Sequence, residues 1–329
     1  MSGDLTTDTD RYTLPFMGRV WELDALHDNG AMSQYATITA ISESPVTEGR
    51  LYVGTDDGLL HTSPDGGETW AALTSLPGVP ERSFVNDVEA GQHGDGTVFV
   101  AADAHKIGNY TPLLFRSDDH GRSWTSITGD LPAETIVWTI QQDHINPDLL
   151  FIAAEWGLYT SLNGGENWHR LPGAPTIAFR DLKLHRRDDD VVGATFGRGF
   201  YILDDYGPLR PTAGSALSGG GGVLPVRDAW WYVPNLTNQA RGRPTLGTMA
   251  YAAPNPPFGA TFTVHVPELP GTAREARRDR EREQRQRGVD VEFPGYETLR
   301  AEAAEQGPRV LVQVADADGV PVRWVEVPA

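Results

Sequence analysis

Short apolar runs alternate with polar turns between about residue 36 and residue 207, and the alternation falls into four similar units. Each unit contains one almost wholly apolar run, typical of a strand buried on both faces, at residues 51–55, 98–102, 150–154 and 191–195. A more polar run precedes it, at residues 37–42, 84–90, 136–143 and 177–185. We predict antiparallel strands in units 36–76, 82–131, 134–171 and 176–207. Recurring units of this size bury their faces on one another, as in repeat architectures.

A polar motif, which we call the box, follows the third run of the first three units. It reads Ser-x-Asp-x-Gly-x-Ser/Thr-Trp at residues 63–70, 117–124 and 161–168, and the third copy has Asn at two positions. Asp, Asn or Ser in a tight turn accepts hydrogen bonds from backbone N–H groups, while Gly adopts the positive φ that the turn requires. The Trp can pack between neighbouring units, where its burial contributes at most about 4–6 kcal/mol.

These properties predict a structural role for the box rather than a catalytic one. The residues concerned are Ser63, Asp65, Gly67, Trp70, Ser117, Asp119, Gly121, Trp124, Ser161, Asn163, Gly165 and Trp168. The fourth unit keeps its strands but has Asp204-Asp205 in place of the box.

The box resembles the Asp-box, or bacterial neuraminidase repeat, and three copies at this spacing indicate a β-propeller. Over roughly residues 35–329 the chain resembles the later blades of large bacterial sortilin-like proteins, many of which carry a glycosyl-hydrolase label. The resemblance implies blades upstream, a β-sandwich downstream and export, although residues 1–10 lack the basic and apolar regions of a secretory signal. It implies little about activity, because the label rests largely on the repeat.

Composition divides the chain further. Residues 1–35 are expected to be a lead-in from a preceding blade, and residues 36–210 the four blades. The Pro-rich and Gly-rich residues 211–259 predict a linker and a packing segment. Residues 260–329 are expected to begin a β-sandwich, with a helical insertion at 272–288. The predicted fold is all-β: a partial Asp-box propeller of about four blades, then an incomplete β-sandwich with a charged helical insertion.

The balance of charges bears on possible partners. The 329 residues carry a formal net charge of −18, so non-specific nucleic-acid binding is not expected. In residues 273–287, Arg alternates with acidic residues, which favours a solvated helix over a nucleic-acid patch. No apolar run reaches the ~20 residues of a membrane span. An open arc of blades exposes edge strands, so we expect the remaining blades of a larger parent, or a second chain, to cover them.

In a propeller, the turns between the second and third strands lie on the face that usually meets ligands. Those turns carry the candidate binding residues Asp56, Asp57, His105, Glu155, Trp156 and Arg198. Solvated carboxylates beside an exposed Trp could grip a sugar ring or a peptide; alternatively, the Asp residues cap turns and the Trp packs between blades. Asp56, Asp57 and Glu155 are also weak candidates for the carboxylate pair of a glycosidase, which stands ~5–9 Å apart.

Other chemistries lack their motifs. Cysteine is absent, the nine His show no zinc-ligand spacing, and no dinucleotide or phosphate loop is present, so we expect no metal and no cofactor. Residues 179–182 read Phe-Arg-Asp-Leu where a sialidase has Phe-Arg-Ile-Pro. The leading interpretation is a binding module that recognises a peptide or a glycan on its rim without a catalytic site. A glycoside hydrolase acting on a polysaccharide and a purely structural protein stay open as alternatives.

Overall fold

The computed structural model describes residues 3–16, 18–20, 35–81, 83–212, 222–229, 231–232, 258–266, 269 and 271–327. They belong to two compact units, each described by itself: Met1–Gly219 with Val223–Thr263, and Gly220–Gly222 with Val264–Ala329. Much of the expected lead-in and most of the expected linker lie outside the described residues. The lead-in contains a short helix, η1 (Arg11–Thr13), and a strand pair, β1 (Pro15–Phe16) and β2 (Arg19–Val20).

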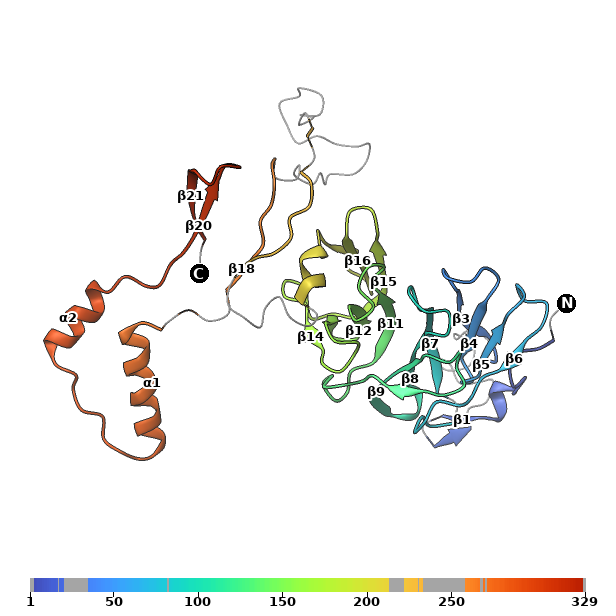
Figure 1. Cartoon of the computed structure of the whole chain (residues 1–329). Coiled ribbons are helices and arrows are strands. Elements are labelled where there is room, and N and C mark those ends of the chain that lie inside the picture. Colours follow the sequence, from blue (N-terminus) through green and yellow to red (C-terminus); the bar gives the residue numbers. More distant parts are fainter. Residues whose placement is uncertain are drawn as a thin grey trace, which may run out of the picture. The chain divides into compact units, whose positions relative to one another are not determined.

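Four antiparallel sheets follow one another in the larger unit, one for each predicted repeat, and Figure 1 shows their strands side by side in chain order. The first blade contains β3 (Ile38–Glu43), β4 (Leu51–Thr55), β5 (Leu60–Ser63) and β6 (Ala71–Ala72). The second contains β7 (Phe84–Ala90), β8 (Val98–Ala104), β9 (Asn109–Ser117) and β10 (Thr125–Ser126). The third contains β11 (Val137–Gln142), β12 (Leu150–Ala154), β13 (Gly157–Ser161) and β14 (His169–Arg170). The fourth contains β15 (Phe179–His185), β16 (Asp190–Thr195) and β17 (Phe200–Leu203). The repeated meander confirms the predicted all-β class and the partial propeller.

The first strand of every blade carries a β-bulge near its start, where its pairing with the second strand passes over one residue. The residues passed over by the pairing are Thr39, Asn86, Trp138 and Arg180. A bulge re-aims its side chain, and in the first two blades the re-aimed group reaches the next blade. Thr39 donates a hydrogen bond of 2.7 Å to the carbonyl of Val85, and Asn86 one of 2.8 Å to that of Val137.

Aromatic side chains at one repeated position fill the spaces between blades. Tyr52, Phe99 and Phe151 each stand second in the second strand of their blade and are fully buried. Each belongs to the apolar cluster that joins its blade to the following one. The equivalent residue of the fourth blade, Val192, is only half-buried. Because the first three blades are packed in this way, we attribute most of the stability of the larger unit to contacts between blades.

The box turns have the hydrogen bonds that their residue types predict. In each turn the N–H of the Gly donates a hydrogen bond of 2.8 Å to the hydroxyl oxygen of the Ser four residues earlier, as Gly67 does to Ser63. The indole N–H of Trp124 donates to the carbonyl of Thr74, and that of Trp168 to Ile127, in each case on the preceding blade and at 2.9 Å. Each such Trp therefore ties its own blade to the one before it.

The fourth blade ends in an ion-pair network. η3 (Gly207–Thr212) follows β17 and carries Arg210, whose guanidinium bonds Asp189 of its own blade and Asp143 of the third blade. The four hydrogen bonds measure 2.6–3.0 Å, and the side chain of Asp143 is wholly buried. Burial raises the pKa of Asp143, but the bonds from Arg210 and its other donors outweigh that effect and hold the pKa below its ordinary value. The network fixes the fourth blade on the third.

The fourth blade also has an exposed apolar face within the described residues. Phe200 and Ile202 of β17 are 75% and 60% exposed, and no described strand pairs with the outer edge of β17. Unpaired edges with apolar side chains promote association. We expect the chain to self-associate in sedimentation experiments, and the double substitution Phe200→Asp with Ile202→Lys to reduce the association. A monodisperse wild-type monomer that unfolds cooperatively would contradict this expectation.

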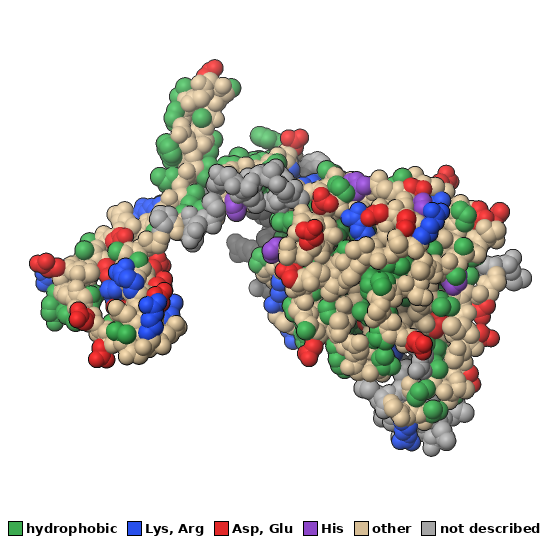
Figure 2. Space-filling model, turned by 60° about the horizontal axis from the view of Figure 1, so that its bottom comes forward, with side chains coloured by type: hydrophobic (Ala, Val, Ile, Leu, Met, Phe, Trp, Pro, Cys, Tyr) green, Lys and Arg blue, Asp and Glu red, His purple; other side chains and the backbone are tan. Residues whose placement is uncertain are grey.

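The smaller unit contains the charged helix expected from the sequence. α1 (Ala273–Gln286) begins after Thr272, which forms a capping box with Glu275. Arg277 bonds Glu302 of a second helix, α2 (Tyr296–Ala304), at 2.7 and 2.9 Å. The sequence analysis did not predict α2, because its only aliphatic residue larger than Ala is Leu299. Arg and acidic side chains are interspersed on this unit in Figure 2, as in a solvated helix pair.

The remaining strands of the described chain form two small sheets. β18 (Gly222–Val223) pairs with β19 (Val264–His265), and β20 (Val310–Ala315) pairs with β21 (Pro321–Val327) as the expected hairpin. Asp316 accepts hydrogen bonds from the backbone of its turn, at 3.0 and 2.9 Å. Within the described ranges, we find no helix with the length and apolar character needed to cross a membrane.

Candidate ligand-binding face

The six residues proposed from the sequence all lie after the second strand of their blade. Asp56 and Asp57 follow β4, and His105 begins η2 (His105–Ile107) after β8. Glu155 and Trp156 lie at the β12–β13 turn, and Arg198 lies between β16 and β17. In the described chain, no hydrogen bond or ion pair joins the Arg198 side chain to the other five.

Asp56 and Asp57 are buried, so the expectation that they are solvated is wrong. They are 2% and 6% exposed. Asp56 accepts a hydrogen bond of 2.7 Å from the N–H of Thr37. Asp57 accepts two bonds of 2.7 Å from Thr7 and one from the Thr55 hydroxyl. A buried carboxylate needs such donors, and here they tie the N-terminal segment and the residue before β3 to the turn that follows β4.

The bulge residues of the third and fourth blades stack on each other. The Arg180 guanidinium lies 3.5 Å from the centre of the Trp138 ring, which is a cation–π contact. Glu155 accepts a hydrogen bond of 3.0 Å from the Trp138 indole N–H and lies 3.9 Å from Arg180. An aromatic ring, a cation and an anion from two blades thus form one cluster.

One exposed aromatic residue contacts this cluster, and a second follows Glu155 in the chain. Phe196 is 75% exposed and its ring centre lies 5.5 Å from the Arg180 guanidinium. Trp156, next to Glu155 in the chain, is 50% exposed, and its indole N–H donates to the carbonyl of Glu134 at 3.2 Å. We call Trp138, Glu155, Trp156, Arg180 and Phe196 the aromatic–charged ridge. Exposed rings beside charged groups can stack on the apolar face of a sugar while hydrogen-bonding its hydroxyls.

Sequence reasoning missed three members of the ridge, namely Trp138, Arg180 and Phe196. Trp138 and Arg180 lie within strands and read as packing residues, and Arg180 was noticed only as part of an incomplete sialidase motif. A large polar or aromatic side chain at the same early position of the first strand in two blades was the available signal. This signal indicates a functional position only when it is known that a bulge turns the side chain at that position away from the regular pairing.

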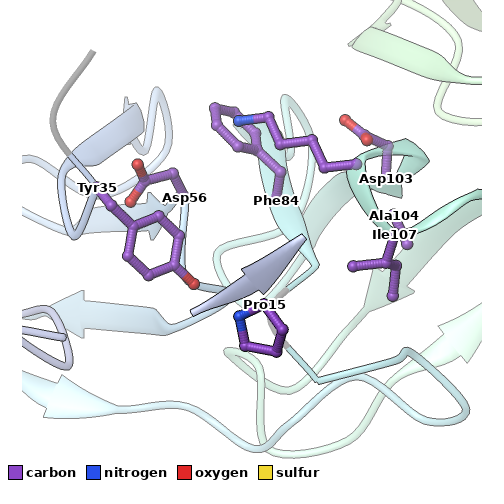
Figure 3. Close-up of a pocket in the computed structure, with 8 residues that line it drawn as sticks. Pro15, Tyr35, Asp56, Phe84, Asp103, Ala104 and Ile107 are labelled. Atoms are coloured by element: carbon purple, nitrogen blue, oxygen red, sulfur yellow. The ribbon is translucent and has the colours of Figure 1, made fainter. Parts of the chain in front are cut away.

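A small pocket lies among the corresponding turns of the first two blades (Figure 3). Its volume is about 20 Å³, and its lining residues are Pro15, Tyr35, Asp56, Phe84, Asp103, Ala104, Lys106 and Ile107. Figure 3 shows Tyr35 and Asp56 on one side and Asp103 on the other. The Lys106 ammonium lies 4.6 Å from the centre of the Phe84 ring. Burial, and then the charge of Arg11, lower the pKa of Lys106.

His105 connects this pocket to the ridge. Oδ1 of Asp103 accepts hydrogen bonds from the backbone N–H of His105, at 3.0 Å, and from its ring Nδ1. Burial raises the pKa of Asp103, but the bonds from His105 more than offset it, so the pKa lies below its ordinary value. On its other side the His105 ring meets Trp138 edge-on, with centres 6.0 Å apart.

Two carboxyl groups of β7, Asp87 and Glu89, were not singled out from the sequence. Alternate residues of a strand share a face, so the two carboxyl groups lie close together. Asp87 accepts a hydrogen bond of 2.5 Å from the Thr139 hydroxyl, and Glu89 accepts bonds of 3.1 Å from Gln92 and Gln141. Burial raises the pKa of both groups, and burial together with the charge of Asp87 raises that of Glu89 to about 7.

One group in the described part of the chain has the composition of a metal site: His185, Asp188 and Asp190, near the β15–β16 turn. Arg187 already donates two hydrogen bonds, of 3.1 and 2.7 Å, to one oxygen of Asp188. Asp190 accepts a hydrogen bond of 3.0 Å from the backbone N–H of Asp205. Since these donors occupy the carboxylates, we assign no metal to the group.

No family model matches the chain. A xyloglucanase from a Paenibacillus species is 30% identical over 114 residues, which is 34% of this chain and 10% of that protein. The match therefore covers about a tenth of the length of this curated relative. An ancestral GH74 enzyme superposes with a TM-score of 0.41 at 20% identity, over 53% of this chain and 26% of that one. YCF48 from Cyanidioschyzon merolae superposes with a TM-score of 0.39 at 20% identity, over 50% and 52% of the two chains. Part of this chain is thus similar in sequence to a glycoside hydrolase.

Proposed function

We propose that the larger unit is an Asp-box β-propeller of the sortilin-like kind and that it binds a glycan on the aromatic–charged ridge. The observation that carries the proposal is the exposure of Trp156 and Phe196 beside the Arg180–Glu155 pair. A sugar ring has an apolar face that stacks on aromatic rings and an edge of hydroxyls that bond to charged groups. The ridge supplies both kinds of group on neighbouring blades.

The curated relative suggests which glycan to try first. That protein is a xyloglucanase, so we propose a β-glucan of the xyloglucan type as the ligand of this chain. A plant polysaccharide is met outside the cell, which agrees with the exported location that we propose for this protein.

Affinity electrophoresis on a panel of xyloglucan, unbranched β-glucan, sialosides and unstructured peptides tests the proposal. We expect retardation by the β-glucans, with no retardation by the sialosides. Binding to peptides alone would contradict the glycan ligand and favour a peptide-binding propeller. Retardation by none of the panel would leave the chain with the purely structural role.

A second candidate function is glycoside hydrolysis, and the carboxyl pair Asp87 and Glu89 is the specific observation in its favour. A carboxyl with a pKa near 7, like that of Glu89, can donate a proton to a leaving group at neutral pH. The same panel, assayed for release of reducing sugars, tests this function. Release by the wild-type chain that the substitution Asp87→Asn abolishes would make the protein an enzyme; binding without release favours the binding module.

A further inference from the structure

The first strands of the second, third and fourth blades carry an apolar pair, three residues apart, on the face that packs against the preceding blade. The pairs are Val85 with Val88, Val137 with Ile140, and Phe179 with Leu182. All six side chains are at most 2% exposed, and each pair belongs to the apolar cluster shared with the preceding blade. In the first blade the same positions hold Ile38 and Ile41, which are 53% and 66% exposed. The first blade thus leaves uncovered the surface that the other three bury.

The opposite face of a blade receives the apolar pair of the next one. Its third strand contributes a leucine, and its second strand a small residue paired with that leucine. These residues are Leu60 with Gly54, Leu114 with Ala101, and Leu158 with Ala153, and each leucine is at most 5% exposed. A methyl group at Gly54 would come within 3.0 Å of the side chains of Val85 and Val88, so the small residue lies directly against the pair.

The fourth blade carries this receiving face without a described blade to cover it. Phe200 occupies the position of the leucine and Ala194 that of the small residue. Phe200 is 75% exposed, whereas the three leucines are buried. Figure 1 shows the first and fourth blades at the two ends of the series. The series therefore ends in the two complementary halves of one recurring interface.

Opposite charges flank the two uncovered faces. Where the first two blades meet, the Ser42 hydroxyl accepts a hydrogen bond of 3.0 Å from the backbone N–H of Ala90. Lys183 occupies the position of Ser42 in the fourth blade, and Glu43 that of Ala90 in the first blade. Both side chains are exposed. A fourth blade packed on a first blade in the recurring geometry therefore brings an ammonium group to a carboxylate.

We propose that two copies of the chain form a head-to-tail dimer, in which the Ile38–Ile41 face of each copy packs on the Phe200 face of the other. A second copy is the occupant because the chain already builds this interface three times from equivalent positions. A contact between two different faces of one molecule is heterologous, and it forms a ring when its rotation closes. Two copies of four blades make about eight, within the ~4–8 blades of known propellers.

This dimer goes beyond the proposed function and does not depend on a glycan. It also assigns a partner surface to the association expected from the exposed face of the fourth blade. That surface is the first blade of another copy rather than a second β17.

Sedimentation of two single-face variants tests the dimer. Ile41→Asp and Phe200→Asp each change one face, at side chains that are exposed in the single chain, so neither places a charge in its core. We expect the wild type at about twice its mass of 35.9 kDa, and each variant alone as a monomer. Ile145→Asp, at a 59% exposed side chain of the third blade, is the matched control and should sediment like the wild type.

Disulfide trapping supplies a readout that does not depend on weakening the contact. The chain contains no cysteine, so Ile38→Cys in one protein and Ala194→Cys in another provide the only thiols. In the recurring interface the equivalent Gly54 and Val85 lie close enough for such a bond. After mixing and mild oxidation, we expect a covalent dimer of the two different proteins. Ile145→Cys replaces Ile38→Cys in the control mixture, which should give less than a tenth of that product.

The outcomes separate a head-to-tail dimer from other kinds of association. Dimers formed by Ile41→Asp alone would overturn the inference, because the contact would then not use the first blade. A wild-type monomer, or oligomers that continue to grow with concentration, would contradict the closed dimer. Equal trapping in the Ile38→Cys and Ile145→Cys mixtures would show that the two faces do not meet.

Discussion

Replacing Arg210 by alanine is expected to destabilise the larger unit by about 3 kcal/mol or more. The substitution removes the bidentate partner of Asp143, whose side chain is wholly buried, and leaves that charge with only neutral donors and a nearby histidine. Breaking a buried ion pair by removing one member typically costs about 3–5 kcal/mol, because the remaining charge stays desolvated. Chemical denaturation followed by intrinsic fluorescence measures the change in the free energy of unfolding.

Arg227→Ala is the matched control for this experiment. Arg227 is 44% exposed and lies 3.5 Å from Asp205, so its loss should cost no more than about 1 kcal/mol. If the two alanine variants prove equally stable, the Arg210 network does not fix the fourth blade. If Arg210→Ala instead unfolds in two separate transitions, the fourth blade unfolds by itself when Arg210 is absent.

Replacing Glu89 by glutamine is expected to stabilise the protein above pH 7 by about 1–3 kcal/mol. The pKa of Glu89 is raised from 4.5 to about 7 in the folded chain, so the folded protein binds a proton that the unfolded chain has released. The contribution of this group to stability is full below pH 4.5 and is lost as the pH rises to about 7. A shift of this size corresponds to at most about 3 kcal/mol.

The comparison between variant and wild type isolates this effect from other titrating groups. His61, whose pKa is lowered mainly by burial, favours the folded protein as pH rises and acts in the opposite direction. The difference in unfolding free energy between Glu89→Gln and wild type should be near zero at pH 4.5 and grow toward pH 7. A difference that does not change with pH would mean that Glu89 has an ordinary pKa in the folded chain.

The sequence predicted the strands well because each blade is encoded locally. The apolar run 150–154 coincides with β12, and the box turn that follows β13 closes through hydrogen bonds between residues two to four apart. Such short-range hydrogen bonds can be predicted from the residue types of the turn alone. The two-residue strand β14 left no comparable pattern, and neither did α2.

The candidate site was harder to read because its contacts join residues of different blades. Trp138 and Arg180 meet only because equivalent bulges turn both side chains to the same place. Glu155 and Trp156 were found from the turn that they occupy, since the propeller topology fixes where that turn lies. Asp56 and Asp57 occupy the equivalent turn but were misread as solvated. Their donors Thr37 and Thr7 lie 19 and 50 residues away in the chain, so the residue types of the turn do not show these contacts.

Calorimetric titration with xyloglucan of three proteins, the wild type, Trp156→Ala and Trp324→Ala, tests the central claim most directly. Both tryptophans are about half exposed, but only Trp156 belongs to the ridge, while Trp324 lies in the hairpin strand β21. The account predicts that Trp156→Ala weakens binding tenfold or more, by about the energy of one lost stacking contact, and that Trp324→Ala binds like the wild type. Undiminished binding by Trp156→Ala, or an equal loss in both variants, would contradict a glycan site on the aromatic–charged ridge.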